Sequence, residues 1–191
     1  MLQLGTGSCY SPKPEERAAK QAECFGWMVK AAERGGLSAA QIYMANAYID
    51  GSNGLQKSGD YAFKWMMQAA EQGDLNARHS VGLAYAGNNQ AFRDLPTGIE
   101  PDAGQAEMWL KKAAAAGHIS AMLDLGRLYF EGELLARNMS QSIYWYQQAA
   151  GKRNVLAMRK LGDMYERGID AQPNPQEALK WYKLAAGGPV K

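Results

Sequence analysis

Apolar residues recur along most of the chain at the three- and four-residue spacing of a helix that buries one face. In four stretches, an alanine is followed by apolar or aromatic residues four and eight positions later, which places all three within about 80° on a helical wheel. The stretches begin at Ala40, Ala77, Ala121 and Ala157. No competing stretch alternates apolar and polar residues, so the pattern predicts an all-α protein.

A second helical pattern lies between these stretches. Each copy reads W-x-x-x-A-A and has a small residue three positions before the tryptophan, so the small residue, the tryptophan and the first alanine share one helix face. The tryptophans are Trp27, Trp65, Trp109, Trp145 and Trp181. An aromatic stripe that repeats at helical spacing is typical of a core, and we expect all five tryptophans to be buried.

Glycine, with 21 of 191 residues, is enriched over the usual ~7%, and the excess is periodic. A glycine five positions after the first alanine, present in three of the four stretches, predicts close approach of a neighbouring helix backbone. Glycines 11 positions after it predict helix ends. Helix starts are predicted at Asn174-Pro175, and Asp60 and Asp102 are predicted N-caps.

Together the two patterns resemble the Sel-one-like (Sel1-like) repeat, a relative of the tetratricopeptide repeat. The matching halves are A-x-x-x-L-G-x-x-Y-x-x-G and A-x-x-W-Y-x-x-A-A-x-x-G, and the resemblance covers about residues 14–188. It implies a right-handed α-solenoid of about four and a half helix-turn-helix repeats. We expect a tail at 1–13 and a single domain at 14–188, with units at about 14–35, 36–72, 73–116, 117–152 and 153–188.

The resemblance implies a non-enzymatic scaffold that holds a partner protein on its concave face. One such role is an adaptor; another is a bacterial immunity protein that neutralises a secreted toxic effector. The alternative function is a cell-envelope adaptor that binds a glycan or peptidoglycan fragment. The sequence holds no G-x-S-x-G, P-loop or H-E-x-x-H motif, so we predict no enzyme, no cofactor and no metal site.

Helical geometry places the candidate contact residues opposite the buried stripe, at positions two, six and ten after each first alanine. The tetratricopeptide relationship adds position nine. The partner-binding candidates are Ile42, Asn46, Ile49, Asp50, His79, Leu83, Leu123, Arg127, Phe130, Glu131, Arg159, Asp163, Glu166 and Arg167. This mixture of apolar residues and charges of both signs suits a protein partner better than a nucleic acid. The alternative is that these positions are merely solvated.

The second unit contains an insertion between its helices, at residues 88–102. Its tryptophans are 44 residues apart, against 36 in each of the next two units. Insertions in repeats map to loops on one edge and often carry specificity. We therefore predict Phe92, Arg93 and Leu95 as loop contacts, with packing of the loop on its own repeat as the alternative.

Charge and cysteine content narrow the partners further. Twenty-one basic and 19 acidic residues leave a net charge of +2, which favours neither nucleic acid nor an anionic membrane. No apolar run reaches the roughly 18 residues of a membrane span. The two cysteines have three interpretations: a buried thiol at Cys24, a Cys9–Cys24 disulfide, or an N-terminal lipid anchor at Cys9. A disulfide would fit a periplasmic protein, and reduced cysteines a cytoplasmic one.

Overall fold

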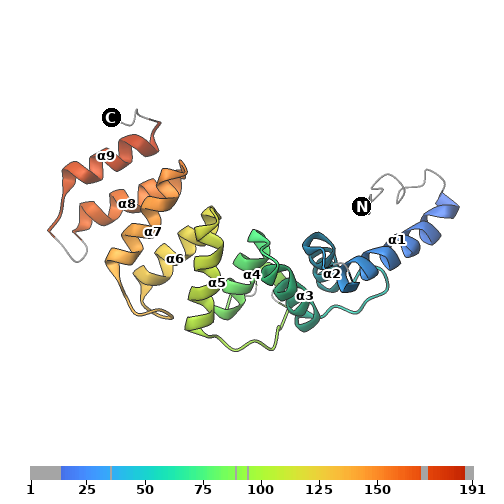
Figure 1. The fold of residues 1–191 in the computed structure, drawn as a ribbon. Coiled ribbons are helices and arrows are strands. Elements are labelled where there is room, and N and C mark those ends of the chain that lie inside the picture. The colour runs from blue at the N-terminus through green and yellow to red at the C-terminus, as the bar shows by residue number, and fades with distance from the viewer. Residues whose placement is uncertain (1–13, 35, 89, 94, 169–171, 188–191) are drawn as a thin grey trace. The chain divides into compact units, whose positions relative to one another are not determined.

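Helices form all the regular structure in the described residues, which are 14–34, 36–88, 90–93, 95–168 and 172–187 of this computed structural model. The prediction of an all-α chain built from helix-turn-helix repeats is confirmed (Figure 1). The elements are α1 (Pro14–Arg34), α2 (Ser38–Asp50), α3 (Gly59–Glu71), α4 (Leu75–Tyr85), the short 3₁₀ helix η1 (Gln90–Phe92), α5 (Ala103–Ala115), α6 (Ile119–Glu131), α7 (Met139–Gly151), α8 (Val155–Arg167) and α9 (Pro175–Ala185).

The chain divides into two compact units, unit 1 (Met1–Glu100) and unit 2 (Pro101–Lys191). The division falls within the predicted insertion, before α5. A single continuous domain over 14–188, and the handedness of its solenoid, stay predictions; the predicted tail at 1–13 lies outside the described residues. Of the helices described here, none combines the length and apolar character needed to cross a bilayer.

In unit 1, each helix packs against the next, from α1 to α4. The core between α1 and α2 contains Ala32, Ala40 and Met44, and Trp65 of α3 packs against this cluster. Gln41 is buried beside it. Its Nε2 donates hydrogen bonds to the carbonyl of Ala32 at 3.4 Å and to Oε1 of Gln68 at 3.3 Å, so the buried amide is satisfied.

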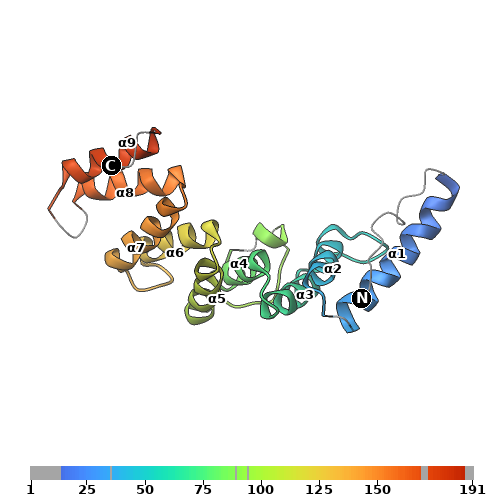
Figure 2. The same cartoon turned by 45° about the horizontal axis from the view of Figure 1, so that its top comes forward.

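Unit 2 repeats this arrangement from α5 to α9, and α8 and α9 lie side by side in Figure 2. Its buried stripes are those that the sequence predicts. Leu125 in α6 and Leu161 in α8, each four positions after the first alanine, are fully buried. These stripes determine which faces of α6 and α8 remain available to other molecules.

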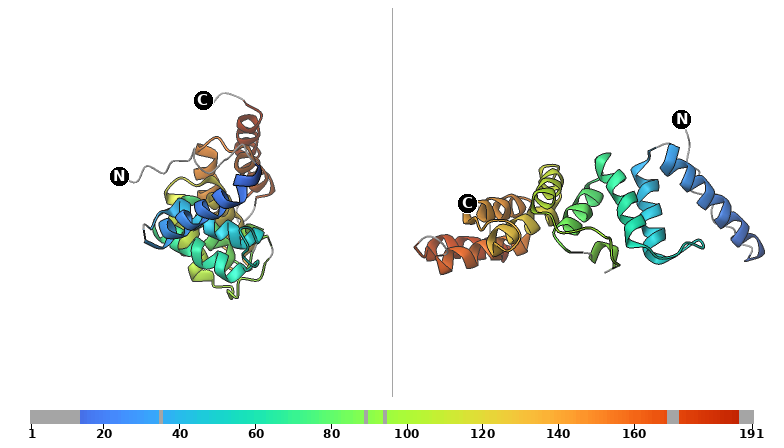
Figure 3. Two further views of the ribbon diagram at one scale, coloured as in Figure 1. Left: turned by 90° about the vertical axis from the view of Figure 1, so that its right-hand side faces the viewer. Right: turned by 90° about the horizontal axis from the view of Figure 1, so that it is seen from below.

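The expectation that all five tryptophans are buried holds for Trp109 and Trp145, whereas Trp65 and Trp181 are half-buried and the expectation is wrong for Trp27. Its side chain is 55% exposed, whereas Trp145 at the same repeat position is 8% exposed. The reason is visible in unit 1, where Trp65 packs against the helices that precede it. Among the described residues no helix precedes α1, which packs on α2 at one end of the unit (Figure 3). The open ring of Trp27 is instead approached by Lys30 Nζ, 4.9 Å from its centroid.

Most of the predicted helix boundaries are confirmed. Asp102 and Asn174 cap α5 and α9, each accepting a backbone N–H at 2.9 and 3.1 Å respectively. Gly168 ends α8 with φ of 63°, a left-handed conformation that favours glycine. Asp60 is not a cap, because α3 begins at Gly59, two residues earlier than a cap at Asp60 requires, and Ser58 Oγ accepts the capping hydrogen bond instead.

Candidate partner-binding site

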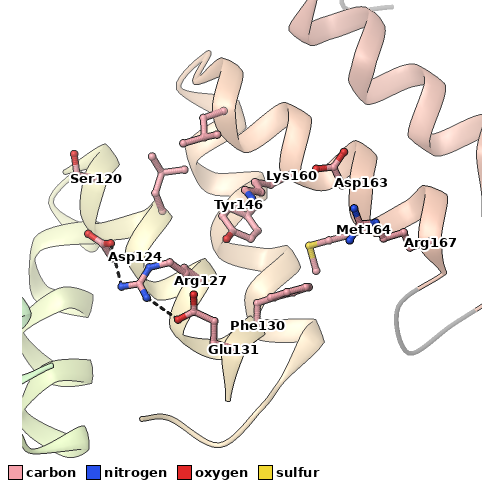
Figure 4. A pocket seen from close by; sticks show the side chains of 12 residues that line it. Ser120, Asp124, Arg127, Phe130, Glu131, Tyr146, Lys160, Asp163, Met164 and Arg167 are labelled. Atoms are coloured by element: carbon pink, nitrogen blue, oxygen red, sulfur yellow. Dashed lines mark hydrogen bonds and ion pairs between the residues drawn. The ribbon is translucent and has the colours of Figure 1, made fainter. Parts of the chain in front are cut away.

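A pocket of about 450 Å³ lies on unit 2, between α6 and α8, with α7 behind it (Figure 4). It combines apolar side chains with charges of both signs. Its lining residues are Ser120, Leu123, Asp124, Arg127, Phe130 and Glu131 of α6, Tyr146 of α7, and Leu156, Lys160, Asp163, Met164 and Arg167 of α8.

Helix periodicity explains why these side chains meet. On both helices the lining residues recur at spacings of three and four, on the face turned away from the buried leucines. Six of the fourteen predicted contact residues are brought together here: Leu123, Arg127, Phe130, Glu131, Asp163 and Arg167. Five of the six follow from the wheel geometry, and Phe130 follows from the tetratricopeptide relationship; whether this face binds a partner stays a prediction.

Sequence reasoning missed the other half of the lining. The residues missed are Ser120, Asp124, Tyr146, Leu156, Lys160 and Met164. Four of them occupy positions one before and three after the first alanine of their helix. Those positions fall at about 260° and 300° on the wheel, whereas the positions searched span about 200° to 280°. A search that took every residue of a slightly wider arc would have found all four.

The α6 side of the pocket contains one cation held by two carboxylates. Arg127 Nη1 lies 2.6 Å from Oε2 of Glu131, and its Nη2 lies 3.7 Å from Oδ1 of Asp124. These pairs follow the i,i+4 and i,i+3 spacing that places opposite charges together on a helix surface. The charge of Arg127 is therefore largely compensated within α6.

The α8 side differs, because its cations are uncompensated. The side chains of Lys160 and Arg167 make no hydrogen bond or ion pair with any described residue. The carboxylates of α8 instead face α9. The Tyr182 hydroxyl lies 2.8 Å from Oδ1 of Asp163 and 3.0 Å from Oε2 of Glu166, and its proton is shared between these two acceptors. These bonds, with Asp163 the larger cause, raise the pKa of Tyr182 above its ordinary value.

Tyr146 forms the back of the pocket, and a glycine on α6 makes room for its ring. A Cβ added to Gly126 would lie 2.8 Å from Cε1 of Tyr146, and one added to Gly162 would lie 2.4 Å from Cε1 of Tyr182. At these two positions the nearest atoms belong to a tyrosine ring, whereas the sequence pattern predicted close approach of a helix backbone. Burial raises the pKa of Tyr146 to about 12, so its hydroxyl stays protonated near neutral pH.

Replacing Gly126 with alanine is expected to lower the free energy of unfolding of unit 2 by about 1–2 kcal/mol. Overpacking against the buried Tyr146 ring costs about 1–3 kcal/mol, which outweighs a helix-propensity gain of up to ~1 kcal/mol. Urea denaturation measures the change. Gly151→Ala is the control, because a Cβ there meets nothing within 4 Å. Equal stability of the two variants would contradict the role of the glycine.

Two predicted contact residues are buried and cannot serve as surface contacts in this structure. Ile49 is 4% exposed, because the chain after α2 turns back along its last turn, where Ser58 N donates to the Tyr48 carbonyl at 3.0 Å. Phe92 is 0% exposed, with its ring centroid 5.9 Å from that of Phe63. For Phe92 the alternative interpretation, a loop packed on its own repeat, is the one observed.

The remaining candidates lie away from the pocket. Arg93 of the loop forms an ion pair with Asp50 at the end of α2, and Leu95 is half-buried. Arg159 and Glu166 are exposed on α8 but do not line the pocket. Ile42, Asn46, His79 and Leu83 belong to α2 and α4 of unit 1.

Neither a metal centre nor a free thiol is found in the described part of the chain. No three His, Cys, Asp or Glu side chains within it cluster as a metal ion would require. Cys24, in α1, is disulfide-bonded, so its interpretation as a buried thiol is wrong. Cys9 lies outside the described residues, and both its pairing with Cys24 and its lipidation stay predictions.

Known proteins show the same repeat. The Sel1 repeat family profile matches residues 16–36, 38–74, 83–118, 119–153 and 155–187. The matches at 119–153 and 155–187 contain α6, α7 and α8, whose residues line the pocket. No curated protein matches the chain.

Several solved structures are similar to this one. A protective antigen present in uropathogenic Escherichia coli strains, which displays an SLR fold, is 30% identical with a TM-score of 0.72, over 87% of this chain and 33% of that one. A Sel1 repeat protein from Oxalobacter formigenes is 32% identical with a TM-score of 0.65, over 87% and 64%. An immunity protein from Pseudomonas aeruginosa is 21% identical with a TM-score of 0.46, over 94% and 68%. The chain thus spans a third of the length of the first and under two thirds of the second.

Proposed function

The chain belongs to the Sel1 repeat family, and from this premise we propose that it is a non-enzymatic scaffold that binds a partner protein in the pocket between α6 and α8. Sel1 repeats are in general protein-interaction modules. In this chain the contact is made by the faces of α6 and α8 that line the pocket.

The observation that carries the proposal is the composition of the pocket. Leu123 and Phe130 are partly exposed, and Leu156 is exposed, beside charged side chains of both helices. Their apolar surface has no role in the core, which is formed by the opposite faces of α6 and α8. A concave patch with apolar anchors and a charged rim is typical of a protein–protein interface.

The identity of the partner is a narrower proposal. A secreted toxic effector is one partner class, which would make the protein a bacterial immunity protein, with the periplasm as the expected compartment. A cytoplasmic adaptor is the alternative. A glycan ligand is less favoured, because sugar binding uses open aromatic faces, and of the two aromatic residues in the pocket Tyr146 is buried and only Phe130 is partly exposed.

Arg127→Glu combined with Phe130→Ala is expected to weaken partner binding strongly while unit 2 stays folded. The two side chains supply a central charge and an apolar anchor of the pocket, and both are at least partly exposed. The full chain is immobilised, proteins retained from native lysate are identified, and the affinity of the purified partner is then titrated. We expect a loss of at least tenfold in affinity, as for interface anchor residues.

The control is Arg153→Glu with Tyr144→Ala, which makes the same change of charge and removes an exposed ring outside the pocket. Circular dichroism verifies that both double variants are folded at the assay temperature. If the partner binds both double variants as well as it binds the parent chain, the pocket is not the contact surface.

A further inference from the structure

Uncompensated positive charge is concentrated on α8 and the turn before it. The segment 152–167 contains five basic residues and two acidic ones, a net charge of +3. None of the five side chains makes a hydrogen bond or ion pair with a described residue, whereas the side chains of both acidic residues accept hydrogen bonds from Tyr182. The five are Lys152, Arg153, Arg159, Lys160 and Arg167.

Two of these cations line the pocket. Lys160 and Arg167 are seven residues apart on one face of α8, which is two helical turns, or about 10.5 Å along the axis. Figure 4 shows them on the α8 side of the pocket, with Arg127 and its two carboxylates on the α6 side. Leu123 and Phe130 of α6 and the exposed Leu156 of α8 supply the apolar surface.

The two sides of the pocket are therefore opposite in charge. On α6, Asp124 and Glu131 outnumber Arg127 by one, and on α8 two cations face one carboxylate, Asp163. A ligand carboxylate placed against α8 pairs with Lys160 or Arg167, whereas a carboxylate placed against α6 is repelled by Asp124 and Glu131. Resting on the proposed function, we infer that the pocket binds an acidic segment of the partner protein, in which an apolar anchor residue adjoins Asp or Glu.

This ligand class accounts for both halves of the lining. The apolar anchor covers Leu123, Phe130 and Leu156, and the neighbouring carboxylate pairs with Lys160 or Arg167. A polyphosphate backbone matches less well, because it would meet Asp124 and Glu131 while leaving the apolar surface uncovered. Oligonucleotide binding is therefore a competing outcome for the experiment to detect.

The experiment selects random 12-residue peptides, displayed on phage, on the full-length chain. We expect the enriched peptides to contain an aliphatic or aromatic residue beside Asp or Glu. A synthetic peptide of the enriched sequence is then titrated by fluorescence anisotropy against the parent chain and against Lys160→Glu with Arg167→Glu. Reversal of both cations should weaken binding by about tenfold, and added salt should weaken binding to the parent chain.

The matched control is Lys152→Glu with Arg153→Glu, which makes the same charge change in the same segment but outside the pocket. We expect it to alter affinity less than twofold. A glutamate at the C-terminal end of α8 destabilises the helix. Lys160→Gln with Arg167→Gln therefore serves as a second variant, and we expect it to lose affinity by an intermediate factor. Circular dichroism verifies the fold of each variant.

Four results would overturn the inference: no enriched peptide, enriched peptides without acidic residues, equal losses in the pocket and control variants, or equal competition by a 12-nucleotide single strand. Failure here is distinguishable from failure of the proposed function. If binding of the captured partner requires Arg127 and Phe130 but not Lys160 and Arg167, the pocket is the contact surface, and the inference that it binds an acidic segment is wrong.

Discussion

Replacing Trp145 with alanine is expected to lower the free energy of unfolding of unit 2 by about 3–5 kcal/mol. The side chain is almost fully buried in α7. Its indole Nε1 is buried without a hydrogen-bond partner among the described residues, so the indole contributes by packing rather than by a polar contact. Urea denaturation followed by circular dichroism measures the loss.

Two further variants separate packing from other effects. Trp145→Phe should cost less than Trp145→Ala, because it keeps an aromatic ring in the site and leaves a smaller cavity. Trp27→Ala removes the same side chain at the same repeat position, yet it should cost only about 1 kcal/mol, because that ring is more than half exposed. Equal costs at the two positions would contradict the difference in burial between α1 and α7.

The second large effect is expected in unit 1, at Phe92. Replacing it with alanine should lower the free energy of unfolding by about 3–5 kcal/mol, because the ring is fully buried beneath the loop and packs on Phe63. Phe63 in turn contacts Tyr85 edge to face, with ring centroids 5.7 Å apart, so the loop is fixed to both α3 and α4. Hydrogen exchange should show faster opening of residues 88–100 in the variant.

Arg93→Ala is the control, since it removes only the exposed ion pair with Asp50, worth at most about 1 kcal/mol. Gly59→Ala tests the contact between the loop and α3 independently, because a Cβ at Gly59 would clash with the carbonyl oxygen of Pro96 in the loop. If neither Phe92→Ala nor Gly59→Ala changes the exchange of the loop, the loop is not held by these contacts.

The helices could be predicted because their signals are local. Periodicity places Leu125 and Leu161 in the core, and both are fully buried. The capping residues Asp102 and Asn174 act within three residues of their own position. Five lining residues of the pocket followed from the same wheel geometry, since the face opposite a buried stripe is determined by the sequence of one helix. Phe130 followed instead from the tetratricopeptide relationship.

The features that could not be predicted depend on neighbours distant in the sequence. Trp27 has the same local pattern as the other tryptophans and differs only in having no described helix before it. Phe92 is buried because α3 presents Phe63 to the loop, 29 residues earlier in the chain. Tyr146 reaches the pocket through a contact with Gly126, which no property of α7 reveals.

The glycine–tyrosine contacts also bear on how unit 2 folds. Gly126 and Tyr146, like Gly162 and Tyr182, are 20 residues apart in sequence, so each helical hairpin can close its defining contact without waiting for the rest of the chain. Short sequence separation lowers contact order, and chains of low contact order fold on microsecond to millisecond timescales. The hairpins at 119–153 and 155–187 are thus equivalent starting points for folding, and synthesis on the ribosome can complete the first before the second has emerged.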